Sequence, residues 1–181
     1  ARALGARSVL ADPRDPNSKA RVNQSLKKRD WFMPYAPSIL HEYAHEYMAD
    51  YSCAPYMTMA FDSVASCSEI VPAAVHVDGT VRPHCVRSED QPLFHRLISE
   101  FMRLTGVPIV LNTSFNRHGV PIVATPRQAI EHLLEGVVDV LIVGCFVIAR
   151  SGSRPENDHK LIPESILETL LGIQKGYQFL Q

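Results

Sequence analysis

The segment between residues 93 and 149 alternates twice between a helical and an extended pattern, and this alternation limits the possible folds more than any other feature. Apolar residues recur at helical spacing from Leu93 to Leu104, and Gly106 stands where a C-terminal cap is expected. The continuous apolar run at 107–111 then predicts a short buried strand.

A second helix is predicted to begin after Thr125. Thr125 has the side chain of an N-cap, Pro126 suits the first helical position and Gln128 completes a capping box. This helix would direct three apolar side chains inward, namely Ile130, Leu133 and Leu134. Residues 137–149 predict a second buried strand. Helix, strand, helix and strand with short connections indicate an α/β fold.

The rest of the chain gives weaker signals. We expect a short polar helix at 17–26, and a helix from 38 to about 48 with Ser38 as its N-cap. Two strands are expected at 56–61 and 73–77, with a turn at Asp78 and Gly79. A polar linker at 151–160 and an amphipathic helix at 163–175 would follow the folded part, which we place at 1–150, so that 151–181 forms a separate tail.

Composition argues against several classes of protein. The 181 residues carry 18 Lys and Arg against 19 Asp and Glu, so no strong positive field favours nucleic acid or anionic lipid. The apolar run at 137–149 is too short to span a bilayer, and the first ten residues lack the apolar core of a signal peptide. The four cysteines form no CxxC pair, which favours reduced thiols and a cytoplasmic location.

Small polar residues follow the predicted strand at 107–111. Asn112, Thr113 and Ser114 would lie at the carboxyl edge of the sheet, where open α/β sheets bind ligands. Their amide and hydroxyl groups offer neutral donors and acceptors, and the turning backbone offers N–H groups to a phosphate. On these residues alone, an ordinary polar turn is the competing interpretation.

Basic residues gather in the parts of the chain that have few apolar residues. Several of them converging on one pocket would hold a polyphosphate, because guanidinium and ammonium groups bind phosphate oxygens. Each could equally be a solvated surface charge. The set comprises Arg2, Arg7, Arg14, Lys27, Lys28, Arg29 and Arg82.

Two histidine patterns also suggest chemistry. His76 alternates with apolar residues in the predicted strand at 73–77, where it is either a structural histidine or an acid–base group. His41, Glu42 and His45 fit the HExxH pattern of zinc proteases. A zinc site of this kind needs a third ligand, and Glu69 is the one acidic residue at a suitable distance in the sequence. We therefore regard this match as accidental.

Five ordered blocks resemble the C-terminal domain of the NodU/CmcH-type O-carbamoyltransferases. The blocks lie at 2–14, 27–38, 76–82, 105–116 and 119–129. This resemblance implies an α/β fold with a YrdC-like twisted mixed sheet and flanking helices. It also implies binding of carbamoyl phosphate and ATP, with Mg²⁺, and formation of carbamoyl-adenylate. A separate N-terminal actin-like domain or subunit, which would carry iron, would transfer the carbamoyl group to an acceptor hydroxyl.

The same resemblance implies a set of site residues. Lys27 and Arg82 would be catalytic, and the carbamoyl phosphate and ATP site would be formed by Arg2, Lys27, Arg82, Asn112 and Ser114. We expect these residues to gather beside the polar strand end. Neither a protein-bound metal in this part, nor a membrane, nor a nucleic acid is expected as a partner.

The chain departs from the family pattern at several positions. Met33 stands where the family has an Arg, His84 where it has a Gln, and Val120 where it has a Glu. A thioether cannot bind a phosphate, so one anion contact is lost at Met33. An alternative function is therefore a non-catalytic binding module that docks on a transferase subunit. A third hypothesis, an RNA-associated module, is disfavoured by the near-neutral charge.

Overall fold

A computed structural model describes residues 3–30, 32–33, 35–144 and 146–149 of the chain. These residues fall into two compact units, the first ending at Val123 and the second beginning at Ala124, and each is described by itself. The predicted linker and helix within 151–181 lie outside the described residues.

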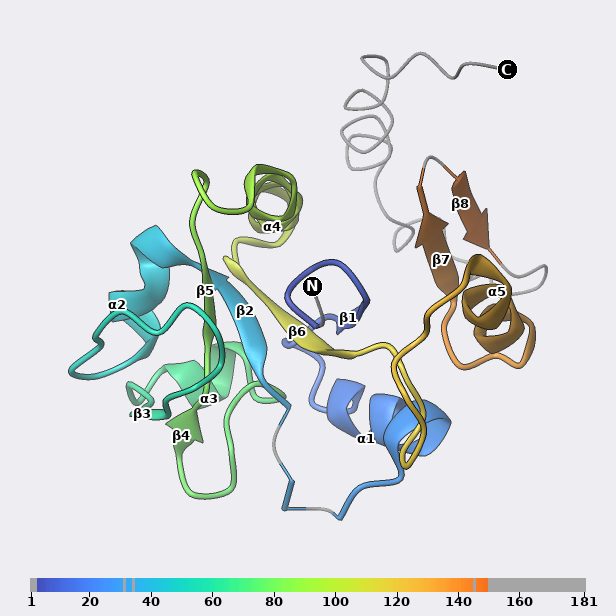
Figure 1. Ribbon diagram of the computed structural model, residues 1–181. Helices are drawn as coiled ribbons and strands as arrows, with labels where there is room; N and C mark the ends of the chain where they lie inside the picture. The colour runs from blue at the N-terminus through green and yellow to red at the C-terminus, as the bar shows by residue number, and fades with distance from the viewer. Residues whose placement is uncertain (1–2, 31, 34, 145, 150–181) are drawn as a thin grey trace. The chain divides into compact units, whose positions relative to one another are not determined.

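A four-stranded mixed sheet forms the centre of the first unit (Figure 1). Its strands stand in the order β1 (Ser8–Ala11), β6 (Ile109–Ser114), β2 (Pro37–Leu40) and β5 (His84–Val86). β6 runs antiparallel to both of its neighbours, whereas β2 and β5 are parallel. Helices flank this sheet, so the predicted α/β class with a mixed sheet is confirmed.

The two faces of the sheet bury different apolar clusters. Helix α4 (Pro92–Thr105) packs on one face, where Phe94 and Ile98 meet Leu40, Val86 and Val110. Because side chains alternate along a strand, the neighbours of these strand residues point to the opposite face. That second cluster is the larger one and includes Ile39, Cys85, Ile109 and Leu111.

Short elements surround the second cluster. They are η2 (His41–Tyr43), α2 (Ala44–Tyr47), β3 (Phe61–Asp62), α3 (Cys67–Ile70) and β4 (Thr80–Val81). β3 and β4 pair antiparallel as a separate two-stranded ribbon. The buried side chains of Ala44, Tyr47, Cys67 and Val81 join this ribbon and these short helices to the sheet through one continuous core.

The predicted helix at 38–48 is wrong in its first part. Residues Pro37–Leu40 form strand β2, and helical structure is confined to η2 and α2. Pro37 and Ser38 have the composition of a helix start, but the backbone of this segment bonds to strands on both sides. Tertiary pairing in the middle of a sheet therefore overrides the local signal.

The two strands predicted near the middle of the chain are also wrong. Of residues 56–61 only Phe61 enters a strand, β3, and residues 73–77 lie in turns closed by bonds such as Ala74 N–H to Val71 O. The predicted turn at Asp78 and Gly79 is present, and Gly79 has a φ of +80°. The polar helix expected at 17–26 consists of α1 (Ser18–Val22) and the π-helical turn η1 (Asn23–Lys27).

The second unit contains α5 (Pro126–Leu134), β7 (Val140–Val143) and β8 (Phe146–Ala149). The capping box at Thr125 and Gln128 is confirmed. The single strand predicted at 137–149 is instead an antiparallel hairpin, which turns at Gly144 with a φ of +57°. Leu133 is buried as predicted, whereas Ile130 and Leu134 are exposed. No helix within the described ranges is long and apolar enough to cross a membrane.

Candidate functional site

The ammonium group of Lys27 joins η1 to the end of strand β6. Its Nζ lies 2.7 Å from the carbonyl oxygen of Ser114 and 3.0 Å from the Ser114 hydroxyl. Two oxygens of Asn116, the carbonyl and Oδ1, lie 2.8 Å from the same nitrogen. Lys27 is only 1% exposed. A buried cation is thus placed at the polar strand end.

Four neutral oxygens, rather than a carboxylate, surround this ammonium group. Burial, together with the positive charge of Arg29, lowers the pKa of Lys27 to about 8. The Ser114 hydroxyl also donates to Asn116 Oδ1, at 2.5 Å. The local field of this strand end is therefore positive, and the turn at 114–116 is held in one conformation by Lys27.

Arg82 lies at the same end of the sheet as Ser114. Arg82 precedes β5 by two residues. Because β2 and β5 are parallel and Ser38 lies opposite His84, both strands begin at this end of the sheet. The bond from Asn112 N–H to Ala36 O places the last residues of β6 beside the start of β2. With β2 between them, β5 and β6 are about 10 Å apart. Arg82 Nε is buried and has no hydrogen-bond partner among the described residues.

A buried polar chain crosses three strands close to this end. Asn112 Nδ2 donates to Ser38 Oγ at 2.8 Å, and Ser38 Oγ lies 2.9 Å from His84 Nδ1. Because the Ser38 oxygen accepts from Asn112, its own hydrogen is free to be donated to His84. Burial lowers the pKa of His84 to about 4, which keeps the ring neutral. Asn112 Oδ1 is buried without a partner in the described part of the chain.

Sequence reasoning did not single out Ser38 and His84 as members of one polar group. The sequence predicts Ser38 as a helix cap, and His84 stands out in it only as a departure from the family pattern. The three side chains meet because the register of β2 against β5 and β6 aligns them on one face. The one local signal was a serine inside an otherwise apolar buried stretch, Pro37–Leu40.

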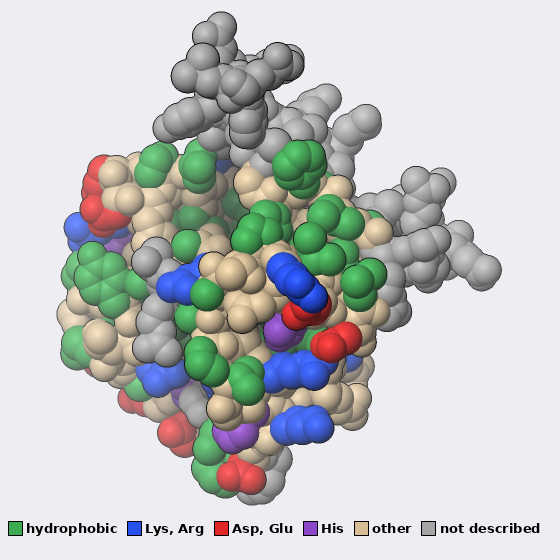
Figure 2. Space-filling view, turned by 45° about the vertical axis from the view of Figure 1, so that its right-hand side comes forward, with side chains coloured by type: hydrophobic (Ala, Val, Ile, Leu, Met, Phe, Trp, Pro, Cys, Tyr) green, Lys and Arg blue, Asp and Glu red, His purple; other side chains and the backbone are tan. Residues whose placement is uncertain are grey.

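Most of the remaining basic residues contact other parts of the protein rather than the end of β6. Figure 2 shows Lys and Arg side chains in separate groups on the face in view. Arg7 donates to the carbonyl of Val123 at 3.0 Å. The Arg29 guanidinium lies over the ring of Tyr35, 5.2 Å from its centroid. Lys28 is exposed at the end of η1, with a φ of 45°. Arg2 lies outside the described residues.

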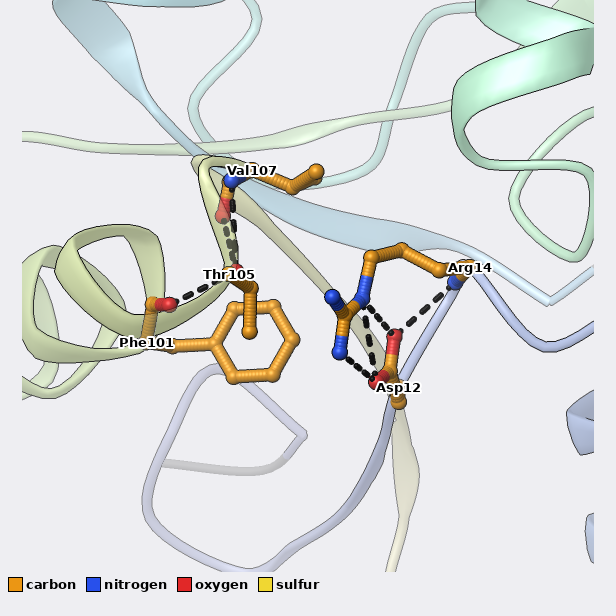
Figure 3. Close-up of polar contacts among 5 residues, drawn as sticks. All are labelled: Asp12, Arg14, Phe101, Thr105 and Val107. Carbon is orange, nitrogen blue, oxygen red and sulfur yellow. Dashed lines mark hydrogen bonds and ion pairs between the residues drawn. The ribbon is translucent and has the colours of Figure 1, made fainter. Parts of the chain in front are cut away.

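Arg14 belongs to a structural contact of the first unit. Its guanidinium lies between the Asp12 carboxylate, at 2.6 Å, and the Phe101 ring, 5.8 Å from the centroid (Figure 3). The hydroxyl of Thr105 donates to the Phe101 carbonyl at 2.6 Å, at the end of α4 (Figure 3). We therefore assign Arg14 to the packing of the segment after β1 against α4 rather than to the polar strand end.

The histidines of the two sequence patterns lie elsewhere. His76 precedes the turn at 78–79, where its ring contacts Thr80. His41 lies in η2, with Nδ1 3.1 Å from the hydroxyl of Tyr51, and His45 is exposed on α2. Among the described residues, no group of three His, Cys, Asp or Glu side chains could hold a metal ion.

Comparison with known proteins gives one family and several relatives. The model of the family described as Carbamoyltransferase C-terminus matches residues 1–150. An uncharacterized protein of Methanocaldococcus jannaschii is 40% identical over 149 residues, which cover 82% of this chain and 24% of that protein. Nodulation protein NolNO of Sinorhizobium fredii is 38% identical over 163 residues, which cover 88% of this chain and 24% of that protein. The chain thus spans about a quarter of the length of these relatives.

Proposed function

Because the chain belongs to the carbamoyltransferase C-terminus family, we propose that it binds carbamoyl phosphate and ATP and forms carbamoyl-adenylate. A separate domain, or a separate subunit, would then transfer the carbamoyl group to an acceptor hydroxyl. The resemblance drawn from the five sequence blocks is confirmed at the level of the family. The substrates, the intermediate and the partner domain are our proposal.

One observation carries this proposal. The buried Lys27 ammonium bonds to the polar end of β6, and Arg82 lies at the same end of the sheet. Anionic ligands are favoured where cations are held in a partly desolvated site, since their attraction is stronger there than in water. A phosphate beside Ser114 would meet this positive field.

The proposed chemistry requires no nucleophilic side chain. Water attacks the carbonyl carbon of carbamoyl phosphate, the C–O bond to the phosphate breaks, and carbamate and phosphate result. A carbamate oxygen then attacks the α-phosphorus of ATP, and the bond to the β-phosphate breaks to release pyrophosphate. Such phosphoryl transfer depends on positioning and on neutralising charge.

The four predicted site residues in the described part of the chain each have a role that suits their surroundings. Lys27 already bonds to four protein oxygens, so we propose that it contributes its field and fixes the turn at 114–116. Arg82, whose Nε has no partner among the described residues, would bind a phosphate oxygen directly. Asn112 Oδ1 and the Ser114 hydroxyl would face the bound substrates at the strand end.

Mg²⁺ has no evident protein site in the described part of the chain. The predicted site residues are three cations, an amide and a hydroxyl, which do not form the carboxylate set that this ion prefers. The described residues also lack a cluster of three possible ligands. We therefore propose no step through a protein-bound metal, and Mg²⁺ would accompany ATP as its counter-ion. Iron is proposed for the separate transferase domain alone.

The alternative, a binding module without catalysis, is favoured by Met33. This partly exposed thioether stands where the family pattern has an Arg, so the anion site has one cation fewer. A module of this kind would bind ATP or carbamoyl phosphate without turnover.

The test is release of pyrophosphate from ATP by the purified chain, with and without carbamoyl phosphate. We expect release only when both substrates are present, and we expect Arg82→Ala to reduce it at least a hundredfold. Arg96→Ala, at an exposed position of α4, is the matched control and should retain activity. Binding of ATP without release would favour the alternative, and equal activity of the Arg82 and Arg96 variants would contradict the proposed site.

A further inference from the structure

The turn at 76–80 holds the ring of His76 through a relay of hydrogen bonds. Asp78 Oδ1 accepts from the backbone N–H of Thr80 at 3.0 Å and from the Thr80 hydroxyl at 2.8 Å. The same hydroxyl oxygen lies 3.1 Å from Nδ1 of His76. The backbone is closed by a bond of 2.9 Å from His76 N–H to Thr80 O. The imidazole is therefore fixed by its own turn.

This relay determines which ring nitrogen of His76 carries the proton. A hydroxyl has a single hydrogen, and that of Thr80 is donated to the carboxylate of Asp78. The Thr80 oxygen must then accept from His76, so Nδ1 carries the hydrogen. Burial lowers the pKa of His76 below its ordinary value; the charge of Asp78 opposes this shift, Arg82 and Lys19 add to it, and the ring is therefore neutral at pH 7. Nε2 consequently presents a lone pair.

Two unsatisfied polar groups lie beside β4 (Thr80–Val81). The ring of His76 contacts Thr80 in this strand, and Arg82 is the residue that follows it. The positive charge of Arg82 acts on the pKa of His76, which places the guanidinium near the ring. Nε2 of His76 and Nε of Arg82 are both buried, and neither has a partner among the described residues. Buried polar atoms in native proteins are almost always paired, so this acceptor and this donor are available to bind a ligand.

We propose that His76 is the residue that recognises the carbamoyl group, by accepting its N–H at Nε2 while Arg82 binds an anionic oxygen of the same ligand. This inference rests on the proposed function. Carbamoyl phosphate combines an amide N–H with an anionic phosphate, which suits this pair of groups. Acetyl phosphate has the same charge and nearly the same shape, but a methyl group replaces the amide. A site that must hydrogen-bond its substrate rejects an analogue that lacks the donor.

The experiment compares binding of carbamoyl phosphate and acetyl phosphate to the 181-residue chain by calorimetry. The wild type should prefer carbamoyl phosphate at least tenfold. In His76→Ala the ratio of the two affinities should fall to about one, because carbamoyl phosphate binds more weakly. The affinity for acetyl phosphate should change less than about twofold. Retained binding of acetyl phosphate shows that the variant is folded.

Thr80 gives a matched pair of variants that leave the imidazole in place. Thr80→Val removes the hydroxyl with little change of shape, which frees the Nδ1 proton, and the preference should fall as in His76→Ala. Thr80→Ser keeps the hydroxyl and should retain the preference. Nitrogen NMR of His76 supplies a second measurement, in which Nδ1 should be protonated in the wild type.

The outcomes separate this inference from the proposed function. If the wild type binds carbamoyl phosphate and His76→Ala keeps the tenfold preference, only the role of His76 is overturned. A proton on Nε2 in the NMR spectrum would also overturn it. If the wild type binds neither compound, both the proposed function and this inference fail.

Discussion

Lys27 and Ser114, 87 positions apart in the sequence, are joined by two hydrogen bonds from one ammonium group, at 2.7 Å to the carbonyl oxygen and 3.0 Å to the hydroxyl. The same nitrogen bonds twice to Asn116. One buried side chain therefore connects η1 to the turn after β6, and it stabilises both segments.

Removing this group should destabilise the first unit. Lys27→Met keeps the length of the side chain but leaves several oxygens without their donor, which costs about 1–3 kcal/mol for each buried group left unsatisfied. We expect a loss of unfolding free energy of that order, measured by urea denaturation. Lys28→Met, at the exposed neighbouring position, is the control and should change the stability by less than about 0.5 kcal/mol. Equal effects of the two variants would contradict a clamping role for Lys27.

The lowered pKa of Lys27 predicts an alkaline dependence of stability. The unfolded lysine keeps its proton up to its ordinary pKa of 10.5, whereas the folded one loses it near 8. Between these pH values the unfolded chain binds more protons, so the free energy of unfolding rises with pH. The wild type should therefore gain stability relative to Lys27→Met between pH 8 and 10, by at most about 1.4 kcal/mol per pH unit. A constant difference between the two would show that Lys27 titrates normally.

His84 predicts the corresponding effect in acid. The folded imidazole has a pKa of about 4 and the unfolded one 6.5, because burial disfavours the charged ring. The unfolded chain therefore binds more protons between pH 6.5 and 4, and stability is lost as the pH falls through that range. His84→Gln keeps a polar partner for Ser38 but does not titrate. The difference in unfolding free energy between this variant and the wild type should change by up to about 1.4 kcal/mol per pH unit between pH 6.5 and 4. Chemical denaturation at several pH values measures it. The pKa of His76 is also lowered, but its effect on stability is the same in the wild type and in His84→Gln and cancels in the difference.

Local sequence signals predicted the elements that depend on local interactions. Helix α4 and its cap at Gly106, where φ is +77°, follow from an apolar stripe and a glycine. The capping box at Thr125 and Gln128 follows from the spacing of these two residue types around Pro126. In both cases the interactions that specify the element lie within it or next to it.

The failures occurred where distant strands decide the structure. Residues Pro37–Leu40 begin like a helix, yet they bond to β5 and β6, whose residues lie more than forty positions away. The chain from Asn112 through Ser38 to His84 exists only in this register. The choice of Lys27 and Arg82 came from the family resemblance. Spacing alone could not place either of them at the end of β6, and their roles in binding remain predictions.

Gly5 is expected to be intolerant of any side chain. A Cβ at this position would lie 2.6–3.0 Å from the ring of Phe94, which itself stacks on His84 with a centroid separation of 5.7 Å. Gly5→Ala should therefore cost about 1–3 kcal/mol from overpacking, in addition to about 1 kcal/mol for its φ of +92°. Gly119→Ala is the matched control, since its φ is +76° but nothing lies within 4 Å of the added carbon. Thermal unfolding of both variants measures the difference, and equal losses would show that the Phe94 ring moves aside freely.

Thr125 is expected to determine the stability of α5 within the second unit. Its hydroxyl accepts from Gln128 N–H at 3.3 Å, and Gln128 Oε1 accepts in return from Thr125 N–H at 3.3 Å and Ala124 N–H at 2.8 Å. Thr125→Ala removes one half of this box and should cost about 0.5–2 kcal/mol, whereas Thr125→Ser keeps the hydroxyl and should cost little. Amide hydrogen exchange reports the effect locally, as faster exchange at Gln128 in the Ala variant only. If exchange at Gln128 is the same in both variants, the hydroxyl does not protect the start of this helix.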